Sequence, residues 1–380
     1  MISKIKRIIH CFLLNIIDLA AIRKANIKEK SLAIIRVDAI GDYILFRDFL
    51  PLLKVSNQYK DYKITLIGNG VWKALAEALD SEYVDDFIFL DRNKFYRKYS
   101  YRFMMLRKLS SFGFDIVLNP MYSREYYISE SITKSLSAHE KITCEGDHSN
   151  ISAHDKKKAD SFYTRLFLNT KEVMFEFYRN QQFFEQLLGK PLSIHMSIDK
   201  RKLPVFNQML PSHFIVLFLG ASRPYRKWSA KNFAEVAIFL KQKYHYEIVI
   251  CGAPSDIEQA QLFKKFFKYD YVDLVGKTTL LELMSVILQS QFLISNETSA
   301  VHFAVALGVS KVIVLYNGRH FGRFTPYPES LHQGYKVVCH PEIAKNKNVY
   351  QEISHDRMYI NQLDINDITV DEVSRVIESS

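Results

Sequence analysis

Short apolar runs alternate with segments of helical periodicity from Leu32 onward. Unbroken apolar runs are typical of parallel strands buried on both faces, and the helices between them cover the sheet. The predicted strands of the first half are Leu32–Val37, Lys63–Ile67, Asp86–Leu90, Phe114–Leu118 and Lys141–Cys144, with helices after Asp42, Val71, Tyr101 and Arg124. The pattern therefore predicts an α/β domain with a doubly wound parallel sheet.

The alternation of predicted strands and helices is interrupted and then resumes. Asp160–Leu188 reads as one helical segment, and Lys190–Pro191 and Pro204–Pro211 as a proline-marked linker. The later strands are Phe214–Leu219, Glu247–Cys251, Asp273–Val275, Phe292–Ile294 and Lys311–Leu315, with helices after Ser229, Ser255, Thr279 and Ser299 and over Ile368–Ile377. We expect two Rossmann-like domains, 31–203 and 204–380, which bind ligands in a cleft at the carboxyl ends of their strands.

Residues 1–30 differ from the rest in charge. They carry seven Lys or Arg residues against Asp18 and Glu29, which is +5 of the formal +10 of the chain. The apolar stretch from Ile8 to Ile22 is interrupted by polar residues and is shorter than the ~20 residues of a membrane span. It also lacks the unbroken apolar region of a signal peptide. The pattern favours an amphipathic helix lying on an anionic membrane, and the alternative is a helix packed on its own domain.

The four cysteines exclude two classes of small domain. Cys11, Cys144, Cys251 and Cys339 are far apart and form no C-x-x-C pair. Neither a disulfide framework nor a zinc site is therefore indicated. A reducing, cytoplasmic setting fits this cysteine usage best.

Two candidate stretches follow the first strand of each half. Gly41 permits a tight turn, and Asp42 would stand at a helix start, facing a ligand or complementing the helix dipole. In Gly220–Trp228, small residues let a ligand approach the backbone, while Arg223, Arg226 and Lys227 can meet a diphosphate. The alternative for this second stretch is a solvated basic turn. Trp228 is expected to pack in the core as a structural residue at the start of the next helix.

A third stretch, Ser295–His302, lies between a strand and a short helix that stops at Gly308. A helix start with a carboxylate, hydroxyls and an imidazole suits a phosphate-containing ligand. The alternative is a capping arrangement made by Ser295 and Thr298.

Together the three stretches resemble glycosyltransferase family 9, the heptosyltransferase family. The family has a Gly-Asp pair after its first strand, matched by Gly41-Asp42. Its basic Lys-x-Trp-type turn is similar to Gly220–Trp228, and its Asn-Asp-Thr-Gly-x-x-His signature to Asn296–His302. Glu297 and Ser299 depart from that signature, where the family has Asp and Gly. The resemblance covers Ser31 to about Pro328.

This resemblance implies an inverting enzyme of the GT-B type, with no cofactor and no metal in the chemical step. It implies Asp42 as the catalytic base, and Lys227 with the helix start at Thr298–His302 as the groups that stabilise the leaving diphosphate. Glu297 is expected to bind sugar or ribose hydroxyls. The donor-binding residues expected on this basis are Gly41, Gly220, Ala221, Ser222, Arg223, Lys227, Glu297, Thr298, Ser299 and His302. The sugar would be heptose or another hexose-like sugar.

The acceptor is expected to meet the first domain at Asp91–Lys108, where cations alternate with aromatic residues. The cations expected to bind it are Arg92, Lys94, Arg97 and Lys98. They suit a phosphorylated, lipid-linked or lipopolysaccharide-type glycan, so we expect a peripheral enzyme at the inner face of the cytoplasmic membrane. Two alternatives remain open: a single-stranded nucleic-acid-binding module, which the preferred interpretation excludes, and another nucleotide-sugar enzyme such as an epimerase.

Overall fold

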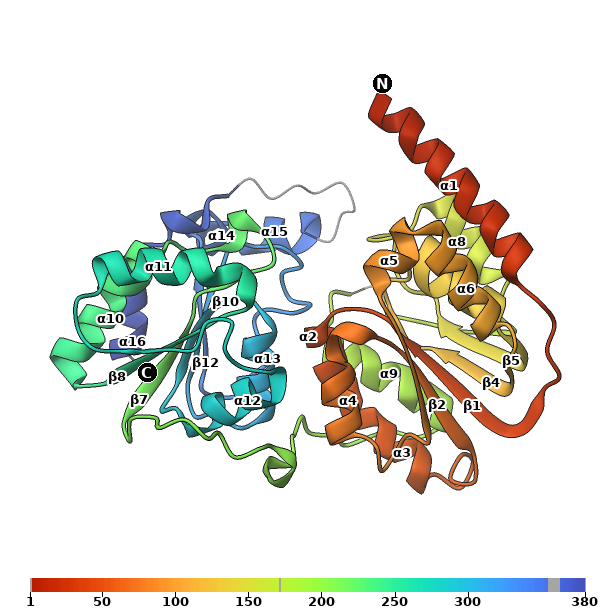
Figure 1. Ribbon diagram of the computed structural model, residues 1–380, viewed down its shortest axis with the longest axis horizontal. Coiled ribbons are helices and arrows are strands. Elements are labelled where there is room, and N and C mark those ends of the chain that lie inside the picture. Colours follow the sequence, from red (N-terminus) through yellow and green to blue (C-terminus); the bar gives the residue numbers. More distant parts are fainter. Residues whose placement is uncertain (1, 171, 355–362, 380) are drawn as a thin grey trace. The chain divides into compact units, whose positions relative to one another are not determined.

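The computed structural model describes residues 2–170, 172–354 and 363–379, and the chain forms two compact units. Unit 1 comprises Met1–Glu172 and Phe177–Ile194, and unit 2 comprises Val173–Glu176 and His195–Ser380. Each unit is built on one six-stranded sheet whose strands are all parallel (Figure 1). The predicted α/β architecture with doubly wound parallel sheets is confirmed.

The sheet of unit 1 has the strand order β3-β2-β1-β4-β5-β6. Its strands are β1 (Lys28–Arg36), β2 (Lys63–Asn69), β3 (Asp86–Leu90), β4 (Gly113–Asn119), β5 (Ser137–Cys144) and β6 (Arg165–Phe167). Leu32 of β1 is in register with Ile64 on one side and Ile116 on the other. The run from Leu32 to Arg36 is completely buried, which explains why its sequence is continuously apolar before the arginine.

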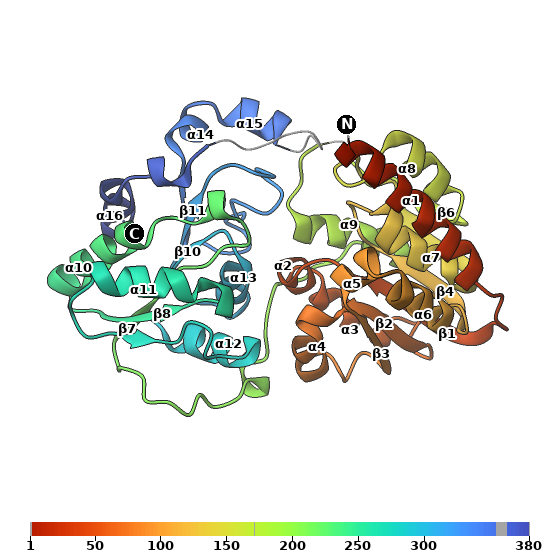
Figure 2. The same cartoon turned by 45° about the horizontal axis from the view of Figure 1, so that its top comes forward.

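Helices cover both faces of this sheet (Figures 1 and 2). They are α1 (Ile2–Ala21), α2 (Ile40–Ile44), α3 (Leu50–Val55), α4 (Lys73–Leu79), α5 (Arg92–Arg97), α6 (Tyr99–Leu109), α7 (Ser131–Ser135), α8 (Ala153–Asp160) and α9 (Glu176–Leu188), with short turns η1 (Arg47–Phe49), η2 (Gly70–Trp72) and the π-helical η3 (Tyr126–Glu130). The predicted single helical segment Asp160–Leu188 is wrong, because β6 and a loop separate α8 from α9. A three-residue strand at a sheet edge is too short to show a period of two, so its sequence carried no strand signal.

The sheet of unit 2 has the strand order β12-β11-β10-β7-β8-β9. Its strands are β7 (Phe214–Phe218), β8 (Glu247–Cys251), β9 (Val272–Asp273), β10 (Leu293–Asn296), β11 (Val312–Tyr316) and β12 (Tyr335–Cys339). The sequence analysis missed β12, an edge strand in which Lys336 is exposed and Tyr335 and Val338 are buried. Its unbroken apolar run, Val337–Cys339, is only three residues long, which is too short to distinguish a strand from other structure.

Seven α-helices lie in the described part of unit 2 downstream of residue 195. They are α10 (Ala230–Tyr244), α11 (Ile257–Phe266), α12 (Leu280–Gln289), α13 (Ser299–Ala306), α14 (Pro341–Lys345), α15 (Lys347–Ile353) and α16 (Val370–Glu378), with short turns η4 (Lys200–Lys202), η5 (Pro224–Arg226), η6 (Pro254–Asp256) and η7 (Ile365–Asp367). Trp228 is fully buried against Phe233, and its Nε1 donates to the carbonyl of Ile368 at 2.8 Å. The predicted structural packing of Trp228 is confirmed, although α10 begins two residues later, after its N-cap residue Ser229.

α1 packs on unit 1 with one of its faces. Leu14, Asp18 and Ala21 are buried, and the helix lies along α6 (Figures 1 and 2). Within the residues that the structure describes, no helix combines the length and the apolar character needed to cross a bilayer. The alternative interpretation of this segment, a helix packed on its own domain, therefore holds for the inward face.

Candidate active site

The turn after β1 carries Asp42 at the carboxyl edge of the first sheet. Asp42 is the third residue of α2, and its Oδ2 accepts the backbone N–H of Ala39 at 3.3 Å. The carboxylate thus caps its helix, as the alternative interpretation expected, yet it stays partly exposed. Gly41 lies inside α2 and has no left-handed backbone conformation, so the tight-turn role predicted for it is not observed.

A buried arginine, which the sequence analysis did not select, builds this turn. Arg36 is fully buried; its Nε pairs with Asp38 at 3.0 Å and its Nη2 donates to the carbonyl of Asp42 at 3.2 Å. The carbonyl of Asp38 in turn accepts from Asn69 Nδ2 at 2.9 Å and Trp72 Nε1 at 3.2 Å. A charged residue closing an apolar strand was the available signal, since such a residue is almost never fully buried unless it is paired.

The order of the second sheet brings the two predicted donor stretches together. β7 lies between β10 and β8, so the turn after β7 is flanked by the turns that follow both neighbours. On one side Arg226 Nη2 pairs with Glu297 Oε2 at 2.5 Å, and on the other Lys227 Nζ pairs with Asp256 Oδ1 at 2.6 Å. Both predicted stretches therefore form one polar surface at the carboxyl edge of this sheet.

Asn296 joins the stretches through the backbone. It is fully buried; its Oδ1 accepts the N–H of Trp228 at 3.0 Å, and its Nδ2 donates to the carbonyls of Leu219 and Gly220, each at 3.1 Å. Removing this amide would leave buried backbone groups without partners. Asn296 is thus a positioning residue for the basic turn, a role that the sequence analysis did not assign to it.

Asp256 is the second carboxylate of this polar surface, and the sequence analysis missed it. It is almost fully buried, and its Oδ2 accepts the N–H of Ala253 at 2.9 Å. A Cβ on Gly220 would meet Asp256 Oδ2 at 2.1 Å. The missing side chain of Gly220 therefore makes room for this carboxylate, rather than for the close ligand approach predicted from the sequence. A carboxylate four residues after the glycine that follows β8 was the only available signal.

The start of α13 carries the remaining predicted donor residues. Glu297, Thr298 and Ser299 are partly exposed, and no side chain caps the helix, so the capping alternative is not observed. Instead, the hydroxyls of Ser295 and Thr298 lie 3.2 Å apart. Of the basic turn, Ser222 and Arg223 are exposed and Ala221 is half-buried.

His302 is buried behind this helix start. Its Nδ1 lies 2.5 Å from the hydroxyl of Tyr327, which is also buried. Burial, and to a lesser degree the charge of Arg226, lowers the pKa of His302 to about 4. The imidazole is therefore neutral at pH 7 and acts as a hydrogen-bonding group, not as a cation for a diphosphate.

The predicted acceptor cations lie on and beside α5 in unit 1. Arg92 pairs with Glu125 at 2.5 Å, and Lys94 with Asp91 at 3.2 Å, whereas Arg97 and Lys98 are exposed. α5 follows β3 as α2 follows β1, so both helices begin at the carboxyl edge of one sheet with β2 between them. The structure thus puts the predicted acceptor cations and Asp42 on the same edge of unit 1.

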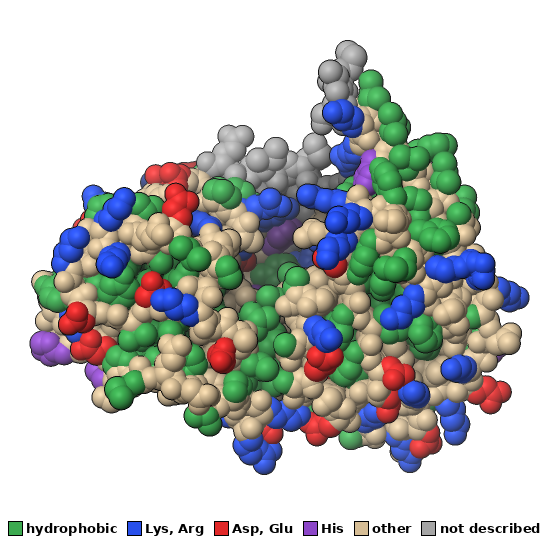
Figure 3. Space-filling model, viewed as in Figure 1, with side chains coloured by type: hydrophobic (Ala, Val, Ile, Leu, Met, Phe, Trp, Pro, Cys, Tyr) green, Lys and Arg blue, Asp and Glu red, His purple; other side chains and the backbone are tan. Residues whose placement is uncertain are grey.

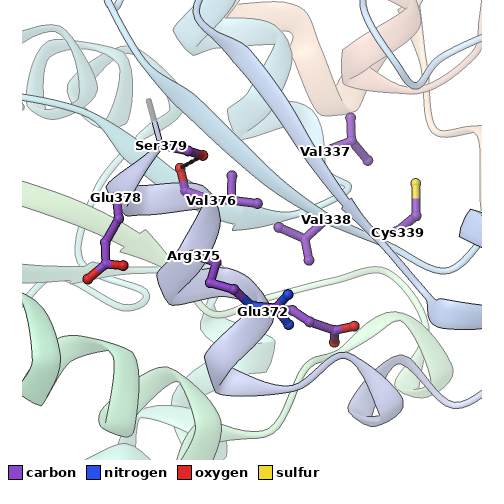
Figure 4. A pocket seen from close by; sticks show the side chains of 8 residues that line it. All are labelled: Val337, Val338, Cys339, Glu372, Arg375, Val376, Glu378 and Ser379. Carbon is purple, nitrogen blue, oxygen red and sulfur yellow. Dashed lines mark hydrogen bonds between the residues drawn. The ribbon is translucent and has the colours of Figure 1, made fainter.

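A groove of about 660 Å³ lies between β12 and α16 (Figure 4). Its described lining residues are Val337, Val338, Cys339, Glu372, Arg375, Val376, Glu378 and Ser379. None of these is a predicted site residue. Across the described ranges, no group of three or more His, Cys, Asp or Glu side chains is arranged to hold a metal ion.

Comparison with known proteins identifies the family. The family described as glycosyltransferase family 9 (heptosyltransferase) matches residues 102–353. No curated protein matches the chain. Among solved structures, a family 9 glycosyl transferase from Veillonella parvula DSM 2008 is 18% identical with a TM-score of 0.68, over 94% of this chain and 98% of that one.

Two E. coli enzymes are also similar. Heptosyltransferase WaaC with ADP is 16% identical with a TM-score of 0.65, over 92% of this chain and 97% of that one. ADP-heptose lps heptosyltransferase II is 16% identical with a TM-score of 0.59, over 92% and 98%. These likenesses confirm the predicted GT-B type of fold with two Rossmann-like halves. The chain belongs to glycosyltransferase family 9, the heptosyltransferase family.

Proposed function

We propose that this enzyme transfers heptose or another hexose-like sugar from a nucleotide-sugar donor to a hydroxyl of a lipid-linked or lipopolysaccharide-type glycan. The observation that carries the proposal is the polar surface of unit 2. There, Asn296 and the Arg226–Glu297 pair hold the basic turn against the start of α13. Cations beside a helix N-terminus suit the diphosphate of such a donor. Unit 2 would bind the donor and unit 1 the acceptor.

ADP-heptose is the first donor to test. The similar E. coli WaaC was solved with ADP and with ADP-2-deoxy-2-fluoro heptose. The similar heptosyltransferase II is described as an ADP-heptose lps heptosyltransferase, which supports the glycan class proposed for the acceptor. Glu297 and Ser299, where the family signature has Asp and Gly, are the positions through which a different sugar would be accommodated.

The proposed reaction inverts the anomeric carbon in one displacement. The acceptor oxygen forms a bond to that carbon as the bond to the donor diphosphate breaks. The acceptor proton passes to the carboxylate of Asp42, and the bonding electrons leave with the nucleoside diphosphate. Lys227 and the start of α13 would stabilise the charge that develops on the leaving group, so no metal is required in this step.

The proposed acceptor is membrane-bound, so the enzyme would work at the anionic inner face of the cytoplasmic membrane. Residues 1–30 would contact that surface, and Arg92, Lys94, Arg97 and Lys98 would bind phosphates of the glycan. Arg97 and Lys98 are the better placed of the four, because they are exposed and form no ion pair among the residues that the structure describes.

The test compares wild-type protein with Asp42→Asn in an assay of ADP release from ADP-heptose and a soluble glycan acceptor. Loss of a general base typically lowers turnover by about 10²–10⁴-fold. ADP affinity, measured by calorimetry, should stay close to the wild-type value, because Asp42 belongs to unit 1.

Glu282→Gln is the matched control. Glu282 is also the third residue of its helix and accepts the N–H of its N-cap residue, Thr279, at 2.8 Å. It should retain wild-type turnover. If Asp42→Asn turned over as fast as Glu282→Gln, Asp42 would be only a helix cap and the proposed mechanism would be wrong.

A further inference from the structure

The outward face of α1 is apolar although the helix is fixed on a folded domain. Six large apolar side chains are exposed by 46 to 69%, namely Ile5, Ile8, Ile9, Phe12, Ile16 and Leu19. They recur at spacings of one to four residues and form one stripe along the helix. Figure 3 shows hydrophobic side chains gathered along one side of α1. Scattered exposed apolar residues are ordinary, but a contiguous stripe of this kind marks a contact surface.

Buried polar contacts fix the orientation of this stripe. Asp18 accepts Arg102 Nε at 2.5 Å and Nη2 at 2.8 Å, and both side chains are buried. Arg102 also donates to Ser131 Oγ at 2.7 Å, and the carbonyl of Ala21 accepts from Ser110 Oγ at 3.3 Å. α1 is therefore part of unit 1, and its outward face cannot turn inward without breaking a buried ion pair.

The apolar surface continues onto α6. His10 of α1 lies 3.0 Å from the hydroxyl of Tyr99, and Ser110 contacts the end of α1, so both ends of α6 adjoin it. Phe103 is four residues after Tyr99 and seven before Ser110, which puts it on the same side of α6. It is 42% exposed. Phe103 therefore lies on the side of α6 that adjoins α1.

Exposed cations flank this surface. Lys6 and Arg7 lie on α1, and Arg97 and Lys98 directly precede Tyr99. Among the residues that the structure describes, none of these four forms an ion pair. An apolar stripe bordered by unpaired cations matches the interface of an anionic bilayer, where apolar groups enter the acyl boundary and cations meet phosphates.

We infer that α1 and the Phe103 side of α6 form a single rigid docking surface for an anionic lipid bilayer. The stripe of α1 and Phe103 lie at the acyl boundary, and Arg97 and Lys98 lie at the level of the headgroups, where the phosphates of the proposed lipid-linked acceptor also lie. This inference rests on the proposed function only in assigning the acceptor to the same membrane. It adds that the docking surface is part of the folded domain and holds the end of α5 against the lipid headgroups.

Tryptophan scanning tests the composite surface. The native tryptophans, Trp72 and Trp228, are fully buried. Quenching of fluorescence by lipid therefore reports on a third tryptophan placed at the surface. Phe12→Trp, Phe103→Trp and Leu168→Trp are mixed with phosphatidylcholine–phosphatidylglycerol vesicles whose acyl chains carry bromine. The first two should be quenched, and Leu168→Trp, exposed elsewhere on unit 1, should not. Quenching at position 12 alone would overturn the two-helix surface, and quenching at neither position would overturn lipid docking.

Loss of binding is measured by vesicle co-sedimentation. The double variant Ile8→Ser, Phe12→Ser should bind about tenfold or more weakly, while Leu168→Ser binds normally. Lys6→Gln and Arg7→Gln should each weaken binding roughly fivefold at low salt. Equal binding to pure phosphatidylcholine would contradict the anionic specificity. A lipid-free dimer that the double variant abolishes would instead assign the stripe to a second copy of the chain.

Two further results separate this inference from the proposed function. Asp42→Asn should bind vesicles as the wild type does. Protein that binds vesicles but turns over no nucleotide sugar would leave the docking surface intact and overturn the proposed function. The reverse result, turnover without vesicle binding, would overturn the docking surface alone.

Discussion

Arg226 and Lys227 are neighbours, but each is held by a carboxylate from a different turn. Glu297 pairs with the first and Asp256, which is almost fully buried, with the second. A buried carboxylate without a positive partner is destabilising. Asp256 therefore holds the Lys227 ammonium beside it. Pre-organised cations favour tight binding of a diphosphate, because less freedom is lost when it binds.

Lys227→Ala should weaken ADP binding as well as slow turnover. A hydrogen bond to a charged group contributes about 1.5–3 kcal/mol, so the expected loss of affinity is tenfold or more. Calorimetry with ADP measures it directly. Lys231→Ala, which removes an exposed lysine paired with Glu235 at 3.7 Å, is the control and should bind ADP normally. Equal ADP affinity in the two variants would remove Lys227 from the donor site.

His302 should make the folded protein sensitive to acid. Its folded pKa of about 4 is below the ordinary value of 6.5, so between these pH values the unfolded chain binds the proton more readily. Stability from this group is therefore present above pH 6.5 and is lost as the pH falls towards 4, by about 3 kcal/mol at most.

Urea unfolding at several pH values measures this loss. His302→Gln cannot titrate and should lose less stability than the wild type as the pH falls from 6.5 to 4. Parallel pH profiles for the two proteins would show that the histidine is protonated as easily in the folded state as in the unfolded one.

At the scale of elements, α1 combines a structural face with an exposed one. Its Asp18 is the carboxylate partner of Arg102, and β1 begins at Lys28. Deleting residues 1–30 would therefore remove the partner of a buried guanidinium and the first residues of a central strand. Vesicle-binding defects are better tested with outward substitutions than with this deletion.

Asp18→Ala should destabilise unit 1 by about 3–5 kcal/mol, because it leaves Arg102 buried without its carboxylate. Replacing both residues, as Asp18→Leu with Arg102→Met, should recover much of the loss by removing the buried charge. Urea unfolding measures both effects. Glu77→Ala breaks an exposed ion pair with Lys73 and should change little. A single variant as stable as that control would mean that α1 contributes little to unit 1.

At the scale of the whole molecule, each unit has its own buried apolar cluster. One cluster surrounds Trp228 and Phe233 in unit 2, and the other includes Phe95 and Leu106 in unit 1. A nucleotide that binds only folded unit 2 should therefore stabilise that unit by mass action.

The true donor nucleotide should raise the melting temperature of unit 2. At a hundredfold excess over its dissociation constant, the gain is about 2.7 kcal/mol, or roughly 5 to 10 °C for a unit of this size. We expect ADP-heptose and ADP to give this shift in a screen of nucleotide sugars, and Lys227→Ala to reduce it. A shift with a uridine nucleotide alone would identify another donor base.

The sequence by itself determined most strands and the turns that contain the candidate site residues. Buried parallel strands need continuous apolar runs, so the central strands of both sheets could be read directly, and Trp228 could be assigned to the core. Short edge strands such as β6 and β12 could not, because few of their residues face the core. The stripe of α1 was visible in the sequence, where Asp18 interrupts the apolar pattern.

Only the tertiary structure decided which charges meet. Asp18 and Arg102 are separated by 84 residues in the sequence. The separation is 71 residues for Arg226 and Glu297, and 29 residues for Lys227 and Asp256. The last two pairs depend on β7 lying between β10 and β8, a strand order that local periodicity does not encode. The first requires α1 to lie along α6 with Asp18 turned inward. An isolated helix has no inward side, so only packing could separate its structural face from its apolar, exposed one.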